Sequence, residues 1–245
     1  MNFLAHLYLA EDSPEALIGS ILPDLARPRD LARTGQDTDK LCGRRLSVPP
    51  DMPAHPEYPP AMLRAIAQHR AVDAFTDTHP IVYRSKQRLH HRPRMYRYAG
   101  ILMDVFYDHF LARDWARYSQ VPLPRFVARV HEAFRGHTHL MPQAMRYPVE
   151  RMIAQDWLGS YATESGVEMV LRRMSLRLSQ RFEREVKLEP AVADLARHRE
   201  ALSADFQEFF PQLVAFASAH KTEGRVALTR PALGPCQCSQ AGGRH

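Results

Sequence analysis

The segment Ile101–Leu111, ILMDVFYDHFL, constrains the fold more than any other part of the chain. Its apolar residues recur at helical spacing, and Asp104 and Asp108 lie four residues apart. At about 100° per residue, both carboxylates share one helix face that is otherwise apolar, with His109 on its flank. Like charges one turn apart repel, and burying an unpaired carboxylate is costly. A bound cation would remove both penalties.

A second segment, Gln68–Asp77, repeats this arrangement. His69, Asp73 and Asp77 stand at positions i, i+4 and i+8 of a predicted helix, on a face that borders apolar residues. The spacing therefore predicts a stripe of one imidazole and two carboxylates at the edge of the core.

Two further segments add donors of the same kind. Asn2 and His6 lie one turn apart in an otherwise apolar first helix, and Asp24 follows Pro23 at the end of the next helix. Imidazole with several carboxylates is a ligand set for Mn²⁺, Fe²⁺ or Zn²⁺, and with more water for Mg²⁺. The set contains no thiolate, which argues against structural zinc.

Each of these residues also has a purely structural interpretation. Asp73 or Asp77 could pair with Arg70 or Arg84, and Asp108 could bridge groups inside the core. A buried histidine is more often hydrogen-bonded in the core than bound to metal. Spacing alone leaves the metal site and the structural ion pairs as open alternatives.

The periodicity predicts an all-α, irregular multi-helix bundle, because strand alternation is absent. We expect one helical domain over 1–220 with a proline- and arginine-rich surface insertion at about 29–59, and a disordered tail over 221–245. Pro211 should break or kink the last helix. The predicted helices are 2–10, 13–22, 60–78, 80–90, 96–115, 124–138, 149–162, 165–183 and 190–219.

Composition bounds the partners and the compartment. Thirty-three Lys and Arg against 27 Asp and Glu give a net charge of +6, which favours an acidic partner. No basic stripe with interleaved aromatics points to nucleic acid, and no run approaches the roughly 18 apolar residues of a membrane span. Three cysteines, Cys42, Cys236 and Cys238, form no disulfide framework, so we expect a cytoplasmic protein.

The stretches MNFLAHLYLA, GSILPDL, HRAVDAFTDTHP, MDVFYDHFLARDW and FFPQLVAFA, in that order, resemble the acyl carrier protein phosphodiesterase family, a divergent branch of the HD phosphohydrolases. The resemblance covers residue 1 to about residue 220 and implies an HD-like helical fold. The insertion at about 29–59 and the tail after 220 depart from the family pattern, and the Asp108-His109 pair reverses the usual His-Asp order.

The resemblance implies metal-dependent hydrolysis of the phosphodiester that joins 4′-phosphopantetheine to a serine of acyl carrier protein, an acidic partner. Manganese is the favoured cation, with magnesium and iron as alternatives. The alternatives to this function are an HD-type hydrolase of a nucleotide or another phosphoester, and a non-catalytic helical module that binds an acidic protein. The implied roles are metal ligation by Asp24, His69, Asp73, Asp104 and Asp108, catalysis by His6, His109 and Asp77, and substrate binding by Arg70 and Asn2.

Overall fold

The structure, a computed structural model, describes residues 1–25 and 58–229, and these residues form helices and no strand. The all-α prediction is confirmed. The α-helices are α1 (Phe3–Leu9), α2 (Pro14–Leu25), α4 (Pro60–Thr78), α5 (Pro80–Gln87), α6 (Pro93–Tyr96), α7 (Ala99–Arg113), α8 (Leu123–Gly136), α9 (Gln143–Ala154), α10 (Trp157–Ser160), α11 (Glu164–Phe182), α12 (Val192–Arg197) and α13 (Arg199–Thr229). Three short 3-10 helices are η1 (Trp115–Arg117), η2 (Thr138–Leu140) and η3 (Glu189–Ala191).

Prolines occupy the first position of several helices. Pro14, Pro60 and Pro80 are the first residues of α2, α4 and α5. A proline there has the helical φ and lacks an N–H that the first turn would leave unpaired. His79 lies between α4 and α5, and its side chain accepts a hydrogen bond from the Ile81 N–H at 3.3 Å. His79 and Pro80 therefore together define the break between α4 and α5.

The end of the chain differs from the expectation. Pro211 lies inside α13, which continues to Thr229 and so includes residues 221–229 of the expected tail. Proline removes one hydrogen bond from a helix interior, but Phe209, Phe210 and Leu213 around it are fully buried. Tertiary packing of that face outweighs the lost bond. The expected insertion, apart from residues 58 and 59, and residues 230–245 lie outside the described residues.

The helix expected over 149–162 is in fact two. α9 begins earlier, at Gln143, and ends at Ala154, and α10 starts at Trp157. Asp156 between them has a left-handed backbone, with φ of 42°, and its side chain accepts a hydrogen bond from the Gly159 N–H at 3.1 Å. Aspartate tolerates this conformation because its short polar side chain bonds locally.

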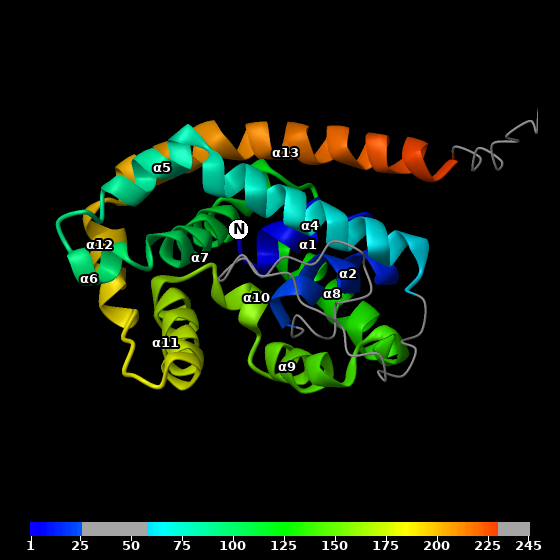
Figure 1. Ribbon diagram of the computed structural model, residues 1–245, viewed down its shortest axis with the longest axis horizontal. Helices are drawn as coiled ribbons and strands as arrows, with labels where there is room; N and C mark the ends of the chain where they lie inside the picture. Colours follow the sequence, from blue (N-terminus) through cyan, green and yellow to red (C-terminus); the bar gives the residue numbers. More distant parts are fainter. Residues whose placement is uncertain (26–57, 230–245) are drawn as a thin grey trace, which may run out of the picture.

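Figure 1 shows the long helix α13 lying along one side of the molecule, above α4 and α5, with α7 beneath them. Aromatic side chains fill the space between α7 and α13: Tyr107, Phe110, Phe206 and Phe209 are fully buried. This packing holds α7 in place. Among the described helices, none combines the length and the apolar character needed to cross a bilayer.

The helices α2 and α4 approach closely at Gly19. A Cβ atom on Gly19 would lie 2.6 Å from the carbonyl oxygen of Met62 and 3.0 Å from the Cβ of Ala65. Only glycine permits this approach without a shift of backbone. The contact matters for the site, because α2 carries Asp24 and α4 carries His69.

We predict that Gly19→Ala destabilises the protein by about 2 kcal/mol, because the added methyl group overpacks a backbone contact. Gly136→Ala is the matched control, since a Cβ there meets nothing within 4 Å and alanine favours the helix by up to about 1 kcal/mol. Denaturant unfolding of both variants measures the difference. Equal stability of the two variants would contradict the close approach of α2 and α4.

Candidate metal centre

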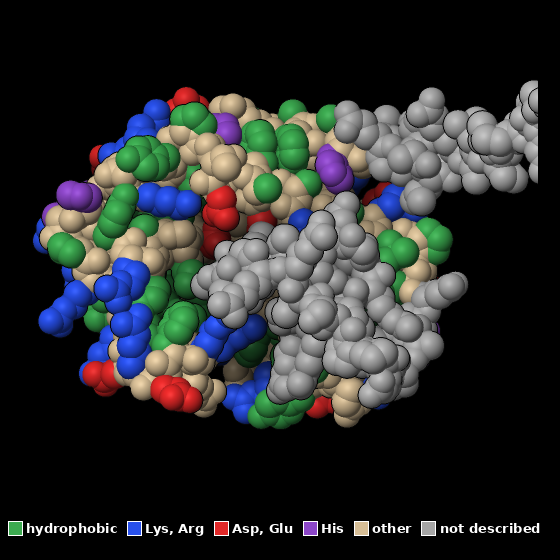
Figure 2. All heavy atoms as spheres, in the orientation of Figure 1, with side chains coloured by type: hydrophobic (Ala, Val, Ile, Leu, Met, Phe, Trp, Pro, Cys, Tyr) green, Lys and Arg blue, Asp and Glu red, His purple; other side chains and the backbone are tan. Residues whose placement is uncertain are grey.

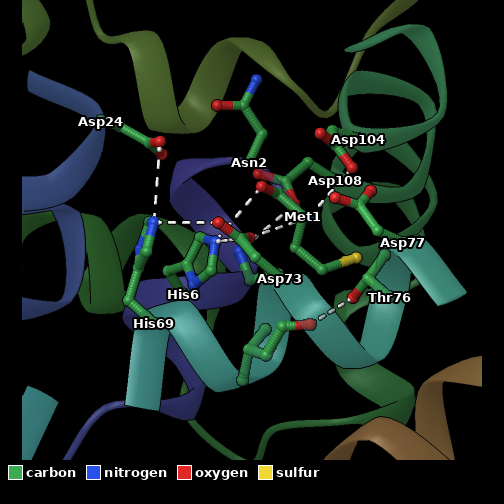
Figure 3. Close-up of polar contacts among 12 residues, drawn as sticks. Met1, Asn2, His6, Asp24, His69, Asp73, Thr76, Asp77, Asp104 and Asp108 are labelled. Carbon is green, nitrogen blue, oxygen red and sulfur yellow. Dashed lines mark hydrogen bonds and ion pairs between the residues drawn. The ribbon is translucent and has the colours of Figure 1, made fainter. Parts of the chain in front are cut away.

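Three side chains from three helices meet at the centre of the fold. His6 of α1, Asp24 of α2 and His69 of α4 each present one ligand atom, and these atoms lie within 4.8 Å of one another. Figure 3 shows the three side chains converging beside Asp73. Both histidines are buried and Asp24 is half-buried. Two imidazoles and a carboxylate are donors that could hold a divalent transition-metal ion.

The ring of His69 is held in one orientation. Its Nδ1 donates to the carbonyl oxygen of Ser20 at 2.7 Å, so its Nε2 faces the carboxylates. Nε2 lies 3.2 Å from Asp73 Oδ2 and 3.6 Å from Asp24 Oδ1. A backbone carbonyl behind the ring is the support that metal-binding histidines use, because it places the Nε2 lone pair toward the ion.

Asp73 connects the two histidines. Its Oδ1 lies 3.1 Å from the Nε2 of His6, and the two imidazole rings stack with centroids 3.8 Å apart. The Nε2 of His6 also lies 3.2 Å from the carbonyl oxygen of Met1. One carboxylate therefore orients both rings.

Charge is distributed unequally between the two rings. Burial lowers the pKa of His6 to about 4, with repulsion from His69 acting in the same direction. Burial also opposes the charge on His69, but attraction to Asp24 and Asp73 outweighs it and raises the pKa of His69. Burial would raise the pKa of Asp73, but His69 and the hydrogen bond from His6 hold that pKa below its usual value. His69 thus binds a proton more tightly than His6 does.

Asp104 and Asp108, predicted as metal ligands, have other cationic or donor partners. The α-ammonium of Met1 donates to Asp104 Oδ1 at 2.9 Å. Asp108 accepts from the backbone N–H groups of Leu4 at 2.7 Å and Ala5 at 3.3 Å. These are first-turn donors of α1, where the helix dipole also favours a carboxylate. These donors offset the like-charge repulsion that the sequence predicts between Asp104 and Asp108.

Burial is the largest influence on the pKa values of Asp104, Asp108 and the Met1 ammonium. Burial raises the pKa of Asp108 to about 7, although the Met1 ammonium and the two N–H groups oppose the rise. Burial raises the pKa of Asp104 as well, against the same ammonium. Burial of that ammonium lowers its pKa, but Asp104 and Asp73 outweigh this and raise it to about 11.

The remaining predicted residues lie around the cluster or apart from it. Asn2 caps α1 by accepting from the Phe3 N–H at 3.0 Å, Arg70 is half-buried beside His69 in α4, and the Asp77 side chain is 59% exposed and 3.6 Å from Lys86. His109 faces elsewhere: its Nδ1 donates to the carbonyl oxygen of Tyr161 at 2.8 Å. The structure therefore does not bring His109 into the cluster.

Comparison with known proteins places this chain in a family. The family model "Acyl carrier protein phosphodiesterase" matches residues 1–41 and 50–213. The chain belongs to this family. Relatives with the same name include proteins of Enterobacter sp. (strain 638), 31% identical over 89% of this chain and 97% of the relative, and of Salmonella dublin, 31% identical over 89% and 98%. A relative from Salmonella agona is 30% identical over 89% of this chain and 98% of the relative. No solved structure matches the chain.

The two family-matched segments include all the site residues predicted from the sequence. Two partners of those residues escaped sequence reasoning because they are backbone groups. The Ser20 carbonyl supports His69 and the Met1 ammonium pairs with Asp104. Neither carries a side-chain signal, although the close packing of Gly19 beside Ser20 marks where α2 approaches α4.

We predict that Asp73→Asn lowers the pKa of His69 in the metal-free protein, because it removes one of the two carboxylates that stabilise the imidazolium. NMR titration of the histidine ring signals measures this shift. In the unsubstituted protein, His6 should titrate near 4 and His69 above 6.5. His109 is the internal control, and its pKa should not respond. Two histidines that both titrate near 6.5, unchanged by the substitution, would contradict this electrostatic arrangement.

Proposed function

We propose that this chain is a metal-dependent phosphodiesterase of the cytoplasm that releases 4′-phosphopantetheine from the serine of holo-acyl carrier protein. The observation that carries the proposal is the convergence of His6, Asp24 and His69 on one point in a member of a family named for this activity. A non-catalytic binding module would explain His6 and His69 through their hydrogen bonds to Asp73 and to backbone carbonyls, but it assigns no role to Asp24 beside them.

The donors fit a divalent cation. His6, Asp24 and His69 would hold it, with Asp73 orienting both rings through its two oxygens. Two imidazoles with carboxylate oxygen suit manganese, iron or zinc, and we propose manganese. When bound, such an ion polarises a phosphodiester and lowers the pKa of a water molecule.

Asn2 supports a place for the substrate next to the cluster. Its Oδ1 is used in capping α1, whereas its buried Nδ2 has no hydrogen-bond partner within the described residues. A buried amide donor left unpaired costs about 1–3 kcal/mol. A phosphate oxygen or a pantetheine carbonyl would accept from this donor, so substrate binding would recover that energy.

The departing serine oxygen needs a proton. Of the two histidines predicted for this step, His6 lies at the cluster and His109 points toward Tyr161. Because we propose His6 as a metal ligand, and burial lowers its pKa to about 4, we assign this proton transfer to neither ring. This assignment leaves His109 with a structural role as a buried donor to a backbone carbonyl.

The test is mass detection of apo-carrier protein formed from holo-carrier protein with Mn²⁺ supplied. We expect turnover that EDTA abolishes, and a loss of at least about 100-fold in His69→Ala together with loss of bound Mn²⁺. His139→Ala, at an exposed histidine, is the control and should retain both. Cleavage of nucleotides without formation of apo-carrier protein would contradict the proposed substrate.

A second variant tests whether His109 donates the proton. His109→Gln keeps a hydrogen-bond donor for Tyr161, so we expect normal folding, metal content and turnover. Loss of turnover with retained Mn²⁺ would instead assign the proton transfer to His109.

A further inference from the structure

One face of α11 carries a line of arginines. Arg173, Arg177 and Arg181 are spaced four residues apart, and Arg184 follows the end of the helix. At about 100° per residue, the first three fall within about 80° of one another. We call these four residues the arginine stripe. Like charges at this spacing repel each other and weaken an isolated helix, so the stripe has a cost that folding does not require.

The stripe is not neutralised. Within residues 1–25 and 58–229, none of its four guanidinium groups pairs with a carboxylate. By contrast, Arg172 on the same helix pairs with Glu168 at 3.3 Å, and Arg199 pairs with Glu164. The contacts of the stripe are to aromatic rings, a hydroxyl, a methionine sulfur and one backbone carbonyl: for example, Arg173 lies 5.1 Å from the centroid of Trp157 and Arg184 donates to the Tyr98 hydroxyl at 3.1 Å.

The stripe contacts the end of α2, which carries Asp24. Arg177 donates from Nη2 to the backbone carbonyl of Asp24 at 2.9 Å, and the carboxylate of Asp24 is part of the cluster with His69. Figure 2 shows Lys and Arg side chains over the region of α6 and α11, on the same face as the acidic side chains near the N-terminus. A partner bound along the stripe would therefore extend to the cluster.

Apolar side chains accompany the arginines. Leu176 is 61% exposed and Met169 is 46% exposed, and both project from the same side of α11 as Arg173. Exposed leucine and methionine beside unpaired guanidinium groups suit a protein surface with acidic and apolar residues. A phosphate backbone would use the arginines and leave the apolar side chains without a partner.

We propose that the arginine stripe is the docking surface for an acidic face of the carrier-protein substrate, which directs the phosphodiester to the His6–Asp24–His69 cluster. This inference rests on the proposed function, which supplies the protein that carries the substrate. Paired charges at the rim of an interface act mainly on association rate and salt dependence. The stripe is thus expected to determine affinity for the protein and not the chemistry.

The experiment measures binding of fluorescent holo-carrier protein by anisotropy, at low and at physiological ionic strength. Arg181→Glu/Arg184→Glu should weaken binding at least about 10-fold at low salt, with a smaller difference at high salt. Arg125→Glu/Arg135→Glu is the matched control: it changes the net charge equally, at exposed arginines of α8 outside the stripe. It should change the Kd less than about twofold. Arg181→Ala/Arg184→Ala is the milder pair if the first variant folds poorly.

Hydrolysis assays of the stripe variants distinguish a role of the stripe in docking from a role in the chemical step. Hydrolysis of bis(4-nitrophenyl) phosphate should be unchanged in the stripe variants, whereas the KM for holo-carrier protein rises. Equal weakening by stripe and control variants, or no weakening by either, would overturn the docking surface even if the unsubstituted protein forms apo-carrier protein. Binding that depends on the stripe without any release of pantetheine would instead overturn the proposed activity alone. Tighter binding of single-stranded RNA than of carrier protein would overturn the choice of partner.

Discussion

Buried charge at the junction of α1, α2, α4 and α7 is the constraint on which the rest of the structure depends. A carboxylate or imidazolium removed from water must find a partner, and here each partner comes from another helix. Asp108 of α7 accepts from the first turn of α1, His69 of α4 donates to the Ser20 carbonyl of α2, and Asp73 of α4 contacts His6 of α1. These contacts fix four helices relative to one another and, as a consequence, bring the candidate donors His6, Asp24 and His69 together.

Much of the fold could be predicted because its signals are local. Prolines at the first helical position mark the starts of α2, α4 and α5, and periodic apolar residues mark α7 and α11. The failures are tertiary in origin. The proline penalty predicts a break or kink at Pro211, but the buried Phe209, Phe210 and Leu213 around it keep α13 continuous. The left-handed Asp156 that divides α9 from α10 has no reliable signature in sequence, since few aspartates adopt that conformation.

The site was predictable in part, for a physical reason. Helical spacing correctly places His69 and Asp73 on one face, where their side chains meet at 3.2 Å. Spacing gives the face of a helix but not its neighbour, so it could not reveal that His109 turns toward Tyr161 while the adjacent Asp108 turns toward α1. It also could not reveal that the Met1 ammonium lies beside Asp104. In the sequence, the arginines of α11 contribute only to the net positive charge. Their position near the cluster became evident from the fold, in which Arg177 donates to the backbone carbonyl of Asp24.

The central claim is that His6 and His69 present nitrogen donors to one divalent ion. Pulsed electron paramagnetic resonance of the protein with one equivalent of Mn²⁺ and ¹⁵N-labelled histidine tests it most directly. The account predicts hyperfine couplings from two imidazole nitrogens, one of which disappears in His6→Ala and the other in His69→Ala. Manganese that binds without any histidine nitrogen coupling would contradict it.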